Sequence, residues 1–332
     1  MVQRLTGDTQ PNQYTKKDKM RLIFAGTPEP AVVALEKLLD SDHEVVAVLT
    51  RPDAPKGRGR TLQPSPVAAL AQEHGIEVLT PRSIKPDTPD GEVFRSRLEE
   101  LSPDCIPVVA YGNLITQDLL DAVPHGWVNL HFSLLPAWRG AAPVQAAIRH
   151  GDPVTGVTTF RIDQGLDTGD ILDTLVEPIS PTDTSDDVLT RLAYAGADLL
   201  VKTMDDLASG KATPRPQVGE ASYAHKILTE DAKVNWNATA VDIDRLIRSV
   251  TPGPGAWTML DQQRFKLGPV TYLSAEECSV DRGELIIEKN RVLVGTSHGC
   301  VKLGMIQPQG KKRMQASDWA RGLHNKEGLR FE

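Results

Sequence analysis

The chain has 332 residues, of which 40% are hydrophobic, and this length and composition predict two domains with cores of their own. No stretch approaches the roughly 20 apolar residues that a membrane-spanning helix needs, and a formal net charge of −7 does not indicate a nucleic-acid binder. The charge is uneven, because residues 225–332 carry 16 Lys and Arg against 13 Asp and Glu, whereas 21 basic and 31 acidic residues precede them. We therefore expect an acidic first domain and a mildly basic second one.

The first 19 residues are polar and lack the apolar run of a secretory signal, so we expect a disordered extension over 1–19. Residues 20–208 then alternate between two kinds of segment. Apolar runs predict strands, and helical spacing or helix-capping residues predict helices. The strands are expected at 21–26, 44–50, 77–80 and 105–112, and the helices at 30–39, 65–75 and 91–101. This alternation predicts an α/β domain with a Rossmann-like, mostly parallel sheet, in which ligands bind beyond the carboxyl ends of the strands.

The dinucleotide fingerprint is missing from this domain. After the first strand comes GTPEPA, with one glycine where G-x-G-x-x-G needs three, so NAD is not indicated. A long helix is expected at 184–209. Residues 209–228 are rich in Pro, Gly and polar residues and are interpreted as a linker. In the second domain, 229–332, a helix at 238–250 precedes short alternating strands, which predict a small β-barrel closed by a helix at 316–323.

The cysteines Cys105, Cys278 and Cys300 are far apart, and neither a C-x-x-C motif nor a histidine pair accompanies them. This spacing argues against a zinc site and against a disulfide framework. We therefore expect no metal and a reducing, cytoplasmic setting. Cys105 lies in an apolar run and is expected in the core.

Residues 127–172 carry the candidate chemistry. In WVNLHFS, a strand would point Asn129, His131 and Ser133 to one face. An amide donor beside an imidazole is what polarising a carbonyl oxygen requires. Asp167, in GLDTG, is expected on a loop between two strands, where a carboxylate could raise the pKa of the imidazole, fix its orientation or accept a proton from an amine. On these residues alone, packing or surface roles for Asn129 and His131 remain the more common alternative.

Covalent catalysis is less favoured by the same segment. Ser133 is not part of a G-x-S-x-G elbow, so direct transfer is preferred to an acyl-enzyme. The D-T-G triplet at Asp167 is also found in aspartic proteases, but those need a second such lobe or a dimer, and the surrounding strand–helix pattern does not fit.

The run N-x-H-x-S-L-L-P-x-W-R-G-A-A-P at 129–143, followed by G-L-D-T-G-D at 165–170, resembles the folate-dependent formyltransferase family. The resemblance extends from about residue 20 to the end of the chain. It implies that 10-formyltetrahydrofolate is the donor and that an amine attacks its formyl carbon. It also implies that Asn129 and His131 stabilise the tetrahedral oxyanion and that Asp167 assists proton transfer. The implied folate-pocket residues are Ser133, Leu134, Leu135 and Pro136.

The same core serves acceptors as different as glycinamide ribonucleotide, amino sugars and methionyl-tRNA. W-R-G-A-A-P at 138–143 resembles the members of the family that act on tRNA. The Gly-rich loop at 51–66 is basic, and its Lys56, Arg58 and Arg60 suit contacts to an acceptor-stem phosphate backbone. The resemblance implies that Arg58, in G-R-G, contacts the acceptor end of tRNA. Without the resemblance, a solvated turn would be the more common explanation of this loop.

The second domain resembles the OB-like barrel that follows the catalytic domain in the tRNA-acting members. Its Lys311, Lys312 and Arg313 would supply an electrostatic footprint for tRNA. The expected partners are folate and initiator methionyl-tRNA, with no membrane and a monomeric enzyme, in the initiation of translation. The alternatives are an enzyme that formylates an amino-sugar nucleotide and a catalytically silent folate- or RNA-binding relative. The intact Asn129, His131 and Asp167 count against the silent relative.

Overall fold

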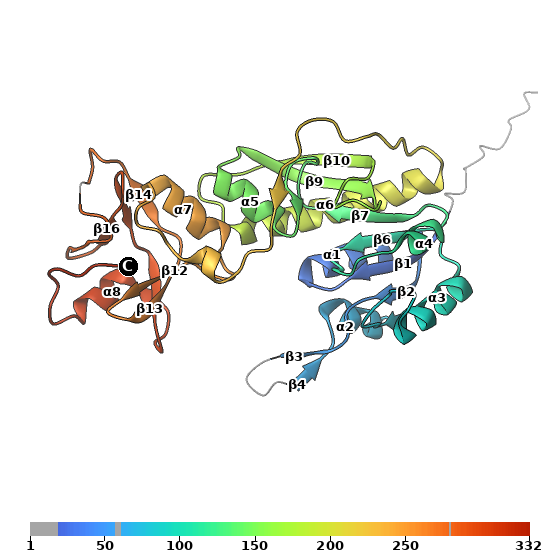
Figure 1. Cartoon of the computed structure of the whole chain (residues 1–332), viewed down its shortest axis with the longest axis horizontal. Coiled ribbons are helices and arrows are strands. Elements are labelled where there is room, and N and C mark those ends of the chain that lie inside the picture. Colours follow the sequence, from blue (N-terminus) through green and yellow to red (C-terminus); the bar gives the residue numbers. More distant parts are fainter. Residues whose placement is uncertain (1–18, 57–60, 279) are drawn as a thin grey trace, which may run out of the picture.

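The computed structural model describes residues 19–56, 61–278 and 280–332, so the predicted extension at 1–19 lies outside the described residues except for Lys19. Figure 1 shows two domains along the long axis of the molecule, with the orange-to-red second domain at one end. No helix in the described part of the chain is long and apolar enough to cross a membrane.

The first domain is built, within the described residues, on a seven-stranded sheet of order β10-β9-β7-β6-β1-β2-β5. Its strands are β1 (Arg21–Gly26), β2 (Glu44–Leu49), β5 (Glu77–Leu79), β6 (Ile106–Val109), β7 (Trp127–His131), β9 (Val154–Arg161) and β10 (Ile171–Pro178). The strands from β7 to β5 pair in parallel, while β9 is antiparallel to both β7 and β10. The mostly parallel sheet is therefore confirmed.

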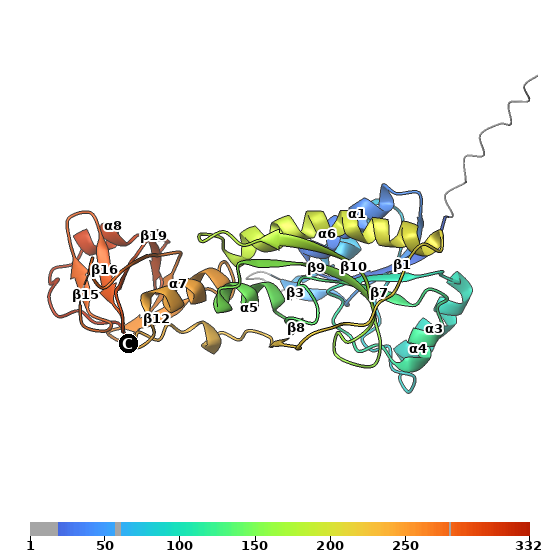
Figure 2. The same ribbon diagram turned by 90° about the horizontal axis from the view of Figure 1, so that it is seen from above.

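Helices cover both faces of this sheet, as expected for nearly continuous apolar strands. They are α1 (Glu29–Leu39), α2 (Pro66–Glu73), α3 (Pro89–Leu101), α4 (Gln117–Asp121), α5 (Pro143–His150) and α6 (Ser185–Ala208). Leu22 and Phe24 of β1 pack in the cluster that includes α1 and α6, whereas Ile23 and Ala25 pack in the cluster that includes α3 and α4. Figure 2 shows α1 and α6 on one side of the sheet and α3 and α4 on the other.

The long helix α6 begins where its capping residues predict. The Thr184 hydroxyl accepts a hydrogen bond from the Asp187 backbone, and the Asp187 carboxylate accepts one from the Thr184 backbone. The helix ends at Ala208, just before Gly210, which has a φ of 68°.

In the second domain, η1 (Glu230–Ala232) and α7 (Ala240–Ser249) precede the strands. Among the described residues, the strands form two four-stranded sheets, β12-β13-β18-β19 and β14-β17-β16-β15. Their bounds are β12 (Trp257–Leu260), β13 (Gln263–Leu267), β14 (Thr271–Leu273), β15 (Leu285–Ile287), β16 (Val292–Gly295), β17 (Cys300–Lys302), β18 (Met305–Pro308) and β19 (Met314–Gln315). The predicted final helix is α8 (Ala316–Arg321), whose Trp319 packs edge-on against Phe265 in the core.

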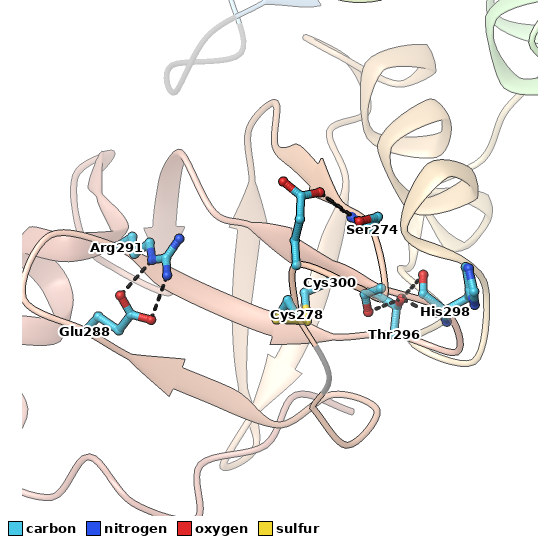
Figure 3. The surroundings of a disulfide bond; sticks show 9 residues. Ser274, Cys278, Glu288, Arg291, Thr296, His298 and Cys300 are labelled. Carbon is cyan, nitrogen blue, oxygen red and sulfur yellow. Dashed lines mark hydrogen bonds and ion pairs between the residues drawn. A yellow bond between two sulfur atoms is a disulfide. The ribbon is translucent and has the colours of Figure 1, made fainter.

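The prediction against a disulfide is wrong, because Cys278 and Cys300 are bonded to each other (Figure 3). Strand β14 is antiparallel to β17 and sets Leu273 opposite Cys300. The turn that follows β14, in which the Glu277 side chain accepts hydrogen bonds from Ser274, brings Cys278 back beside its partner. Strand pairing thus joins two cysteines 22 residues apart, which sequence spacing did not reveal.

Cys105 is buried, as predicted, at the start of the apolar run that contains β6. Burial raises the pKa of its thiol to about 12, because the thiolate would lose its hydration. The described residues contain no group of three or more His, Cys, Asp or Glu side chains placed to hold a metal ion.

Candidate active site

Asn129 and His131 lie in β7, which is held on one side by parallel β6 and on the other by antiparallel β9. The alternate residues Val128 and Leu130 are buried in the hydrophobic core, so the backbone that carries the two polar side chains is fixed. The strand ends at His131, earlier than predicted. Ser133 therefore does not continue the same strand face, and its hydroxyl instead donates a hydrogen bond to the Ala137 carbonyl.

Asp167 lies on the predicted loop between β9 and β10 and faces His131. Its Oδ2 is 3.8 Å from His131 Nδ1 and accepts a hydrogen bond of 2.7 Å from the Gly140 backbone N–H. The His131 side chain is 6% exposed and that of Asp167 is 18% exposed. Low exposure strengthens the interaction between the two groups, because little water screens it.

The protonation of His131 follows from its two ring nitrogens. Nε2 lies 2.9 Å from the Trp138 carbonyl, which can only accept a hydrogen bond, so Nε2 carries a proton. Burial lowers the pKa of His131, and this effect outweighs the opposing effects of the Asp167 carboxylate and the Trp138 carbonyl. Asp167 does favour the charged form, as we expected, but the net direction is the opposite one. Near neutral pH, Nδ1 is thus a free lone pair that faces a carboxylate, an arrangement that attracts a proton donor.

A cavity of about 690 Å³ opens beside this pair, and Asn129 and Asp167 lie in its wall. It adjoins the carboxyl ends of β6 and β7, where a parallel sheet was expected to bind its ligand. Within the described residues, the amide of Asn129 makes no hydrogen bond to protein, so it is available to a ligand. Apolar side chains complete much of the wall, among them Val108, Tyr111, Leu114, Ile115, Phe160 and Ile162.

The segment predicted to line the folate pocket contributes no residue to this wall. None of Ser133, Leu134, Leu135 and Pro136 lines the cavity in the described part of the chain. Leu135 is buried against Phe160 and Ile171, and Phe160 does face the cavity. Leu135 therefore supports the cavity wall from behind.

Sequence reasoning missed several residues of the cavity. Arg139 lies in W-R-G-A-A-P but was not singled out, and His225 and Lys226 come from the predicted linker. Tyr223, 52% exposed, also lies in the wall. The place of Arg139 in the motif W-R-G-A-A-P could have indicated that it lies at the site. The linker residues gave no such indication, because they reach the cavity only through the packing of the linker against the first domain.

The predicted tRNA-binding residues fall in two regions. Lys56 ends β3 (Ala54–Lys56), which pairs with β4 (Thr61–Gln63), while Arg58 and Arg60 lie outside the described residues. Lys311, Lys312 and Arg313 form an exposed turn between β18 and β19.

This basic turn continues onto the face of β13. Arg313 and Lys266 line one small cavity, and Lys266 lines a second small cavity together with Arg264. Arg264 also lies over the Trp257 ring, at 4.0 Å from its centroid. Across the described residues, no carboxylate forms an ion pair with Lys266, Arg264 or the residues of the turn, so the positive charge of this face is not neutralised.

Comparison with known proteins places both domains. Residues 19–204 match the family model described as formyl transferase, and residues 226–324 match the one described as formyl transferase, C-terminal domain. A protein named methionyl-tRNA formyltransferase from Corynebacterium diphtheriae is 70% identical over 310 residues, covering 93% of this chain and 99% of its own. A protein of the same name from Corynebacterium glutamicum (strain R) is 64% identical over 315 residues, covering 94% and 100%.

Solved structures show the same fold at much lower identity. An N-formyltransferase from Helicobacter canadensis, in complex with folinic acid and dTDP-3-aminofucose, matches with a TM-score of 0.65 and 19% identity. The match covers 88% of this chain and 99% of that one.

Proposed function

Since this chain belongs to the formyl transferase family, we propose that it transfers the formyl group of 10-formyltetrahydrofolate to the amino group of initiator methionyl-tRNA. The product would be N-formylmethionyl-tRNA for translation initiation. Relatives of that name, 70% and 64% identical over almost the whole chain, support this acceptor. The observation that carries the chemistry is the pair of buried His131 and partly buried Asp167 beside the amide of Asn129.

The proposed transfer proceeds without a covalent intermediate on the protein. The amine nitrogen attacks the formyl carbon, a new C–N bond forms and the carbonyl π pair moves to oxygen. Asn129 donates a hydrogen bond to the resulting oxyanion, and such a donor contributes roughly 10²–10³-fold in rate. The amine proton passes to the His131–Asp167 pair, because the Nδ1 lone pair and the carboxylate both accept.

The same pair then completes the reaction. Once His131 holds the proton, its imidazolium is stabilised by Asp167, and its positive charge helps Asn129 to stabilise the oxyanion. When the oxyanion collapses, the bond from the formyl carbon to N10 of the folate breaks and N10 takes up the proton. Positioned acid–base catalysis of this kind contributes roughly 10²–10⁴-fold.

The cavity suits a folate. Pockets for ligands of this size are typically about 300–1,000 Å³, mostly apolar, with a few polar groups. The 690 Å³ cavity fits this description, with Phe160 and Ile162 among its apolar residues. We propose that the pteridine lies against this wall and that Ser133, Leu134, Leu135 and Pro136 shape it from behind.

The acceptor would be held by basic residues outside the cavity. We propose that the second domain is an OB-like barrel that binds the body of tRNA through the face formed by Arg264, Lys266, Lys311, Lys312 and Arg313. Unpaired positive charges on one face are the usual footprint of a phosphate backbone. The basic loop with Lys56, Arg58 and Arg60 is proposed to contact the acceptor end. A charged tRNA is used in the cytoplasm, where we propose that the enzyme acts as a monomer.

The test is a formyl-transfer assay in which the purified chain and 10-formyltetrahydrofolate are offered methionyl-tRNA and an amino-sugar nucleotide separately. Formylation of methionyl-tRNA alone is expected. Transfer to the sugar alone would establish the alternative acceptor, and folate binding without transfer would establish a silent relative.

A further inference from the structure

The predicted linker, 209–228, runs past β8 on the surface of the first domain (Figure 2). Its strand β11 (Tyr223–Ala224) pairs in parallel with β8 (Arg139–Gly140), which lies between the His131 strand and α5. Farther back, Arg215 exchanges backbone hydrogen bonds of 2.8 and 2.9 Å with Ile171, the first residue after the Asp167 loop. One continuous linker therefore binds both of the segments that build the His131–Asp167 site.

Gln217 lies between these two attachments and bridges the segments with its side chain. Its Oε1 accepts hydrogen bonds from Arg139, at 2.6 Å from Nη2 and 3.2 Å from Nε. Its Nε2 donates to the carbonyl of Asp167 at 2.7 Å and to that of Gly169 at 3.0 Å. The Gln217 amide thus joins two parts of the site. Its oxygen binds Arg139 in the cavity wall, and its nitrogen binds the loop that carries the Asp167 carboxylate.

The backbone of Asp167 needs such support. Its φ is 53°, in the left-handed region, which is unfavourable for a residue with a Cβ, although less so for Asp than for most others. A residue keeps this conformation only when its surroundings hold it there. The Gln217 hydrogen bond to the Asp167 carbonyl supplies this restraint on one side, and the Gly140 N–H holds the carboxylate on the other.

We infer that Gln217 is a positioning residue for formyl transfer, which holds the Asp167 loop so that the carboxylate faces His131. The inference rests on the proposed function and adds a role for the linker in it. Gln217 does not line the cavity, so its effect passes through Asp167 and Arg139. The linker then both leads to the second domain and completes the catalytic site.

The chemistry of the amide provides a sharp test. In Gln217→Glu, the carboxylate still accepts from Arg139 but has no hydrogen to donate, so it repels the carbonyls of Asp167 and Gly169. Gln217→Met has nearly the same length and loses both contacts. Val218→Ala is the matched control, because the neighbouring Val218 side chain is 86% exposed.

The experiment compares kcat, the KM for 10-formyltetrahydrofolate and the Tm of these variants with those of the wild type. Gln217→Glu and Gln217→Met should lose about 10–100-fold in kcat, part of what a positioned acid–base group supplies, with KM and Tm nearly unchanged. An unchanged kcat in Gln217→Glu would overturn the inference, because the Arg139 contact would then suffice. A loss that follows a lower Tm would also overturn it.

A second measurement does not depend on turnover. If Gln217 holds Asp167 near His131, then Gln217→Met should lower the NMR-titrated pKa of His131, because the carboxylate that favours the imidazolium moves away. An unchanged titration would overturn the positioning role. Absence of transfer by the wild type with every acceptor would instead refute the proposed function, and the titration would still decide the role of Gln217.

Discussion

The Oδ2 atom of Asp167 lies 3.8 Å from Nδ1 of His131 while it accepts a hydrogen bond from the Gly140 backbone. His131 is in turn fixed through its other nitrogen by the Trp138 carbonyl. Both side chains are thus oriented by backbone groups of the same segment, 138–140. This relationship leaves a lone pair and a carboxylate facing each other at the edge of the cavity, ready for an amine proton.

The pair itself is the first target for mutation. His131→Ala and Asp167→Asn should each lower kcat by about 10²–10⁴-fold, because each removes a partner of the proton transfer. Asp170→Asn, an exposed carboxylate on the same loop, is the control and should stay near the wild-type value. Steady-state kinetics with circular dichroism to verify folding measure this, and near-normal kcat in either variant would remove that residue from the chemistry.

The pH dependence of kcat tests the protonation of His131. Because burial lowers its pKa, the neutral form that accepts the amine proton persists below the ordinary value of 6.5. The rate should therefore fall only as the pH drops below 6.5, and this acid limb should be missing from the residual activity of His131→Ala. An acid limb centred above 6.5 would mean that the carboxylate outweighs burial.

Counting thiols tests the cysteine arrangement. Cys278 and Cys300 are bonded, and the pKa of buried Cys105 is raised to about 12. A reagent that reacts with thiolates should therefore label no cysteine in the native, unreduced protein. After denaturation without reductant it should label one cysteine, Cys105. All three cysteines of the chain should react after reduction and denaturation. Fast reaction of the native protein would contradict the disulfide or the burial of Cys105.

A buried arginine of α7 forms an ion pair within that helix and also contacts the first domain. Arg248 of α7 donates to the Asp244 carboxylate at 2.8 Å and to the Asp183 carbonyl of the first domain at 3.0 Å. The side chains of Arg248 and Asp244 are only 9% and 7% exposed, so Arg248→Met leaves the Asp244 carboxylate buried without its partner. Urea denaturation should show a loss of about 3–5 kcal/mol.

The control for that loss is an exposed pair in the same domain. Arg321→Met breaks the contact with Asp318 at three residues' spacing, where solvent screens the charges. It should cost at most about 0.5 kcal/mol. Equal losses in the two variants would show that burial does not determine the contribution of Arg248.

The basic face of the second domain should determine the salt dependence of tRNA binding. Lys311→Gln should raise the KM for methionyl-tRNA, leave kcat unchanged and lower the slope of log affinity against log salt by up to about 1. Lys289→Gln, an exposed lysine elsewhere in the same domain, makes the same charge change and serves as control. Equal effects of the two variants would argue against a localised binding face.

Much of this architecture could be predicted from the sequence, because local chemistry specifies it. Apolar runs and helix-capping residues such as Thr184 fixed the order of strands and helices, and the spacing from Asn129 to His131 indicated the strand that carries them. The end of that strand before Ser133 could not be predicted, because the Ala137 carbonyl that captures the Ser133 hydroxyl comes from the turn beyond it.

What the sequence could not predict depends on long-range packing. Cys278 meets Cys300 only through the pairing of β14 with β17, and Gln217 reaches Asp167 across 50 residues. The sequence also could not predict that the pKa of His131 is lowered, since this depends on how deeply the imidazole is buried. Linker composition correctly indicated irregular backbone but gave no sign that this segment would complete the cavity.

The most direct test of the account is single-turnover transfer of a labelled formyl group from 10-formyltetrahydrofolate to methionyl-tRNA by the wild type and by His131→Ala. We expect labelled N-formylmethionyl-tRNA from the wild type and a rate at least about 10²-fold lower from the variant, with folate binding retained by both. Absence of labelled product with the wild type, or an equal rate with His131→Ala, would contradict it.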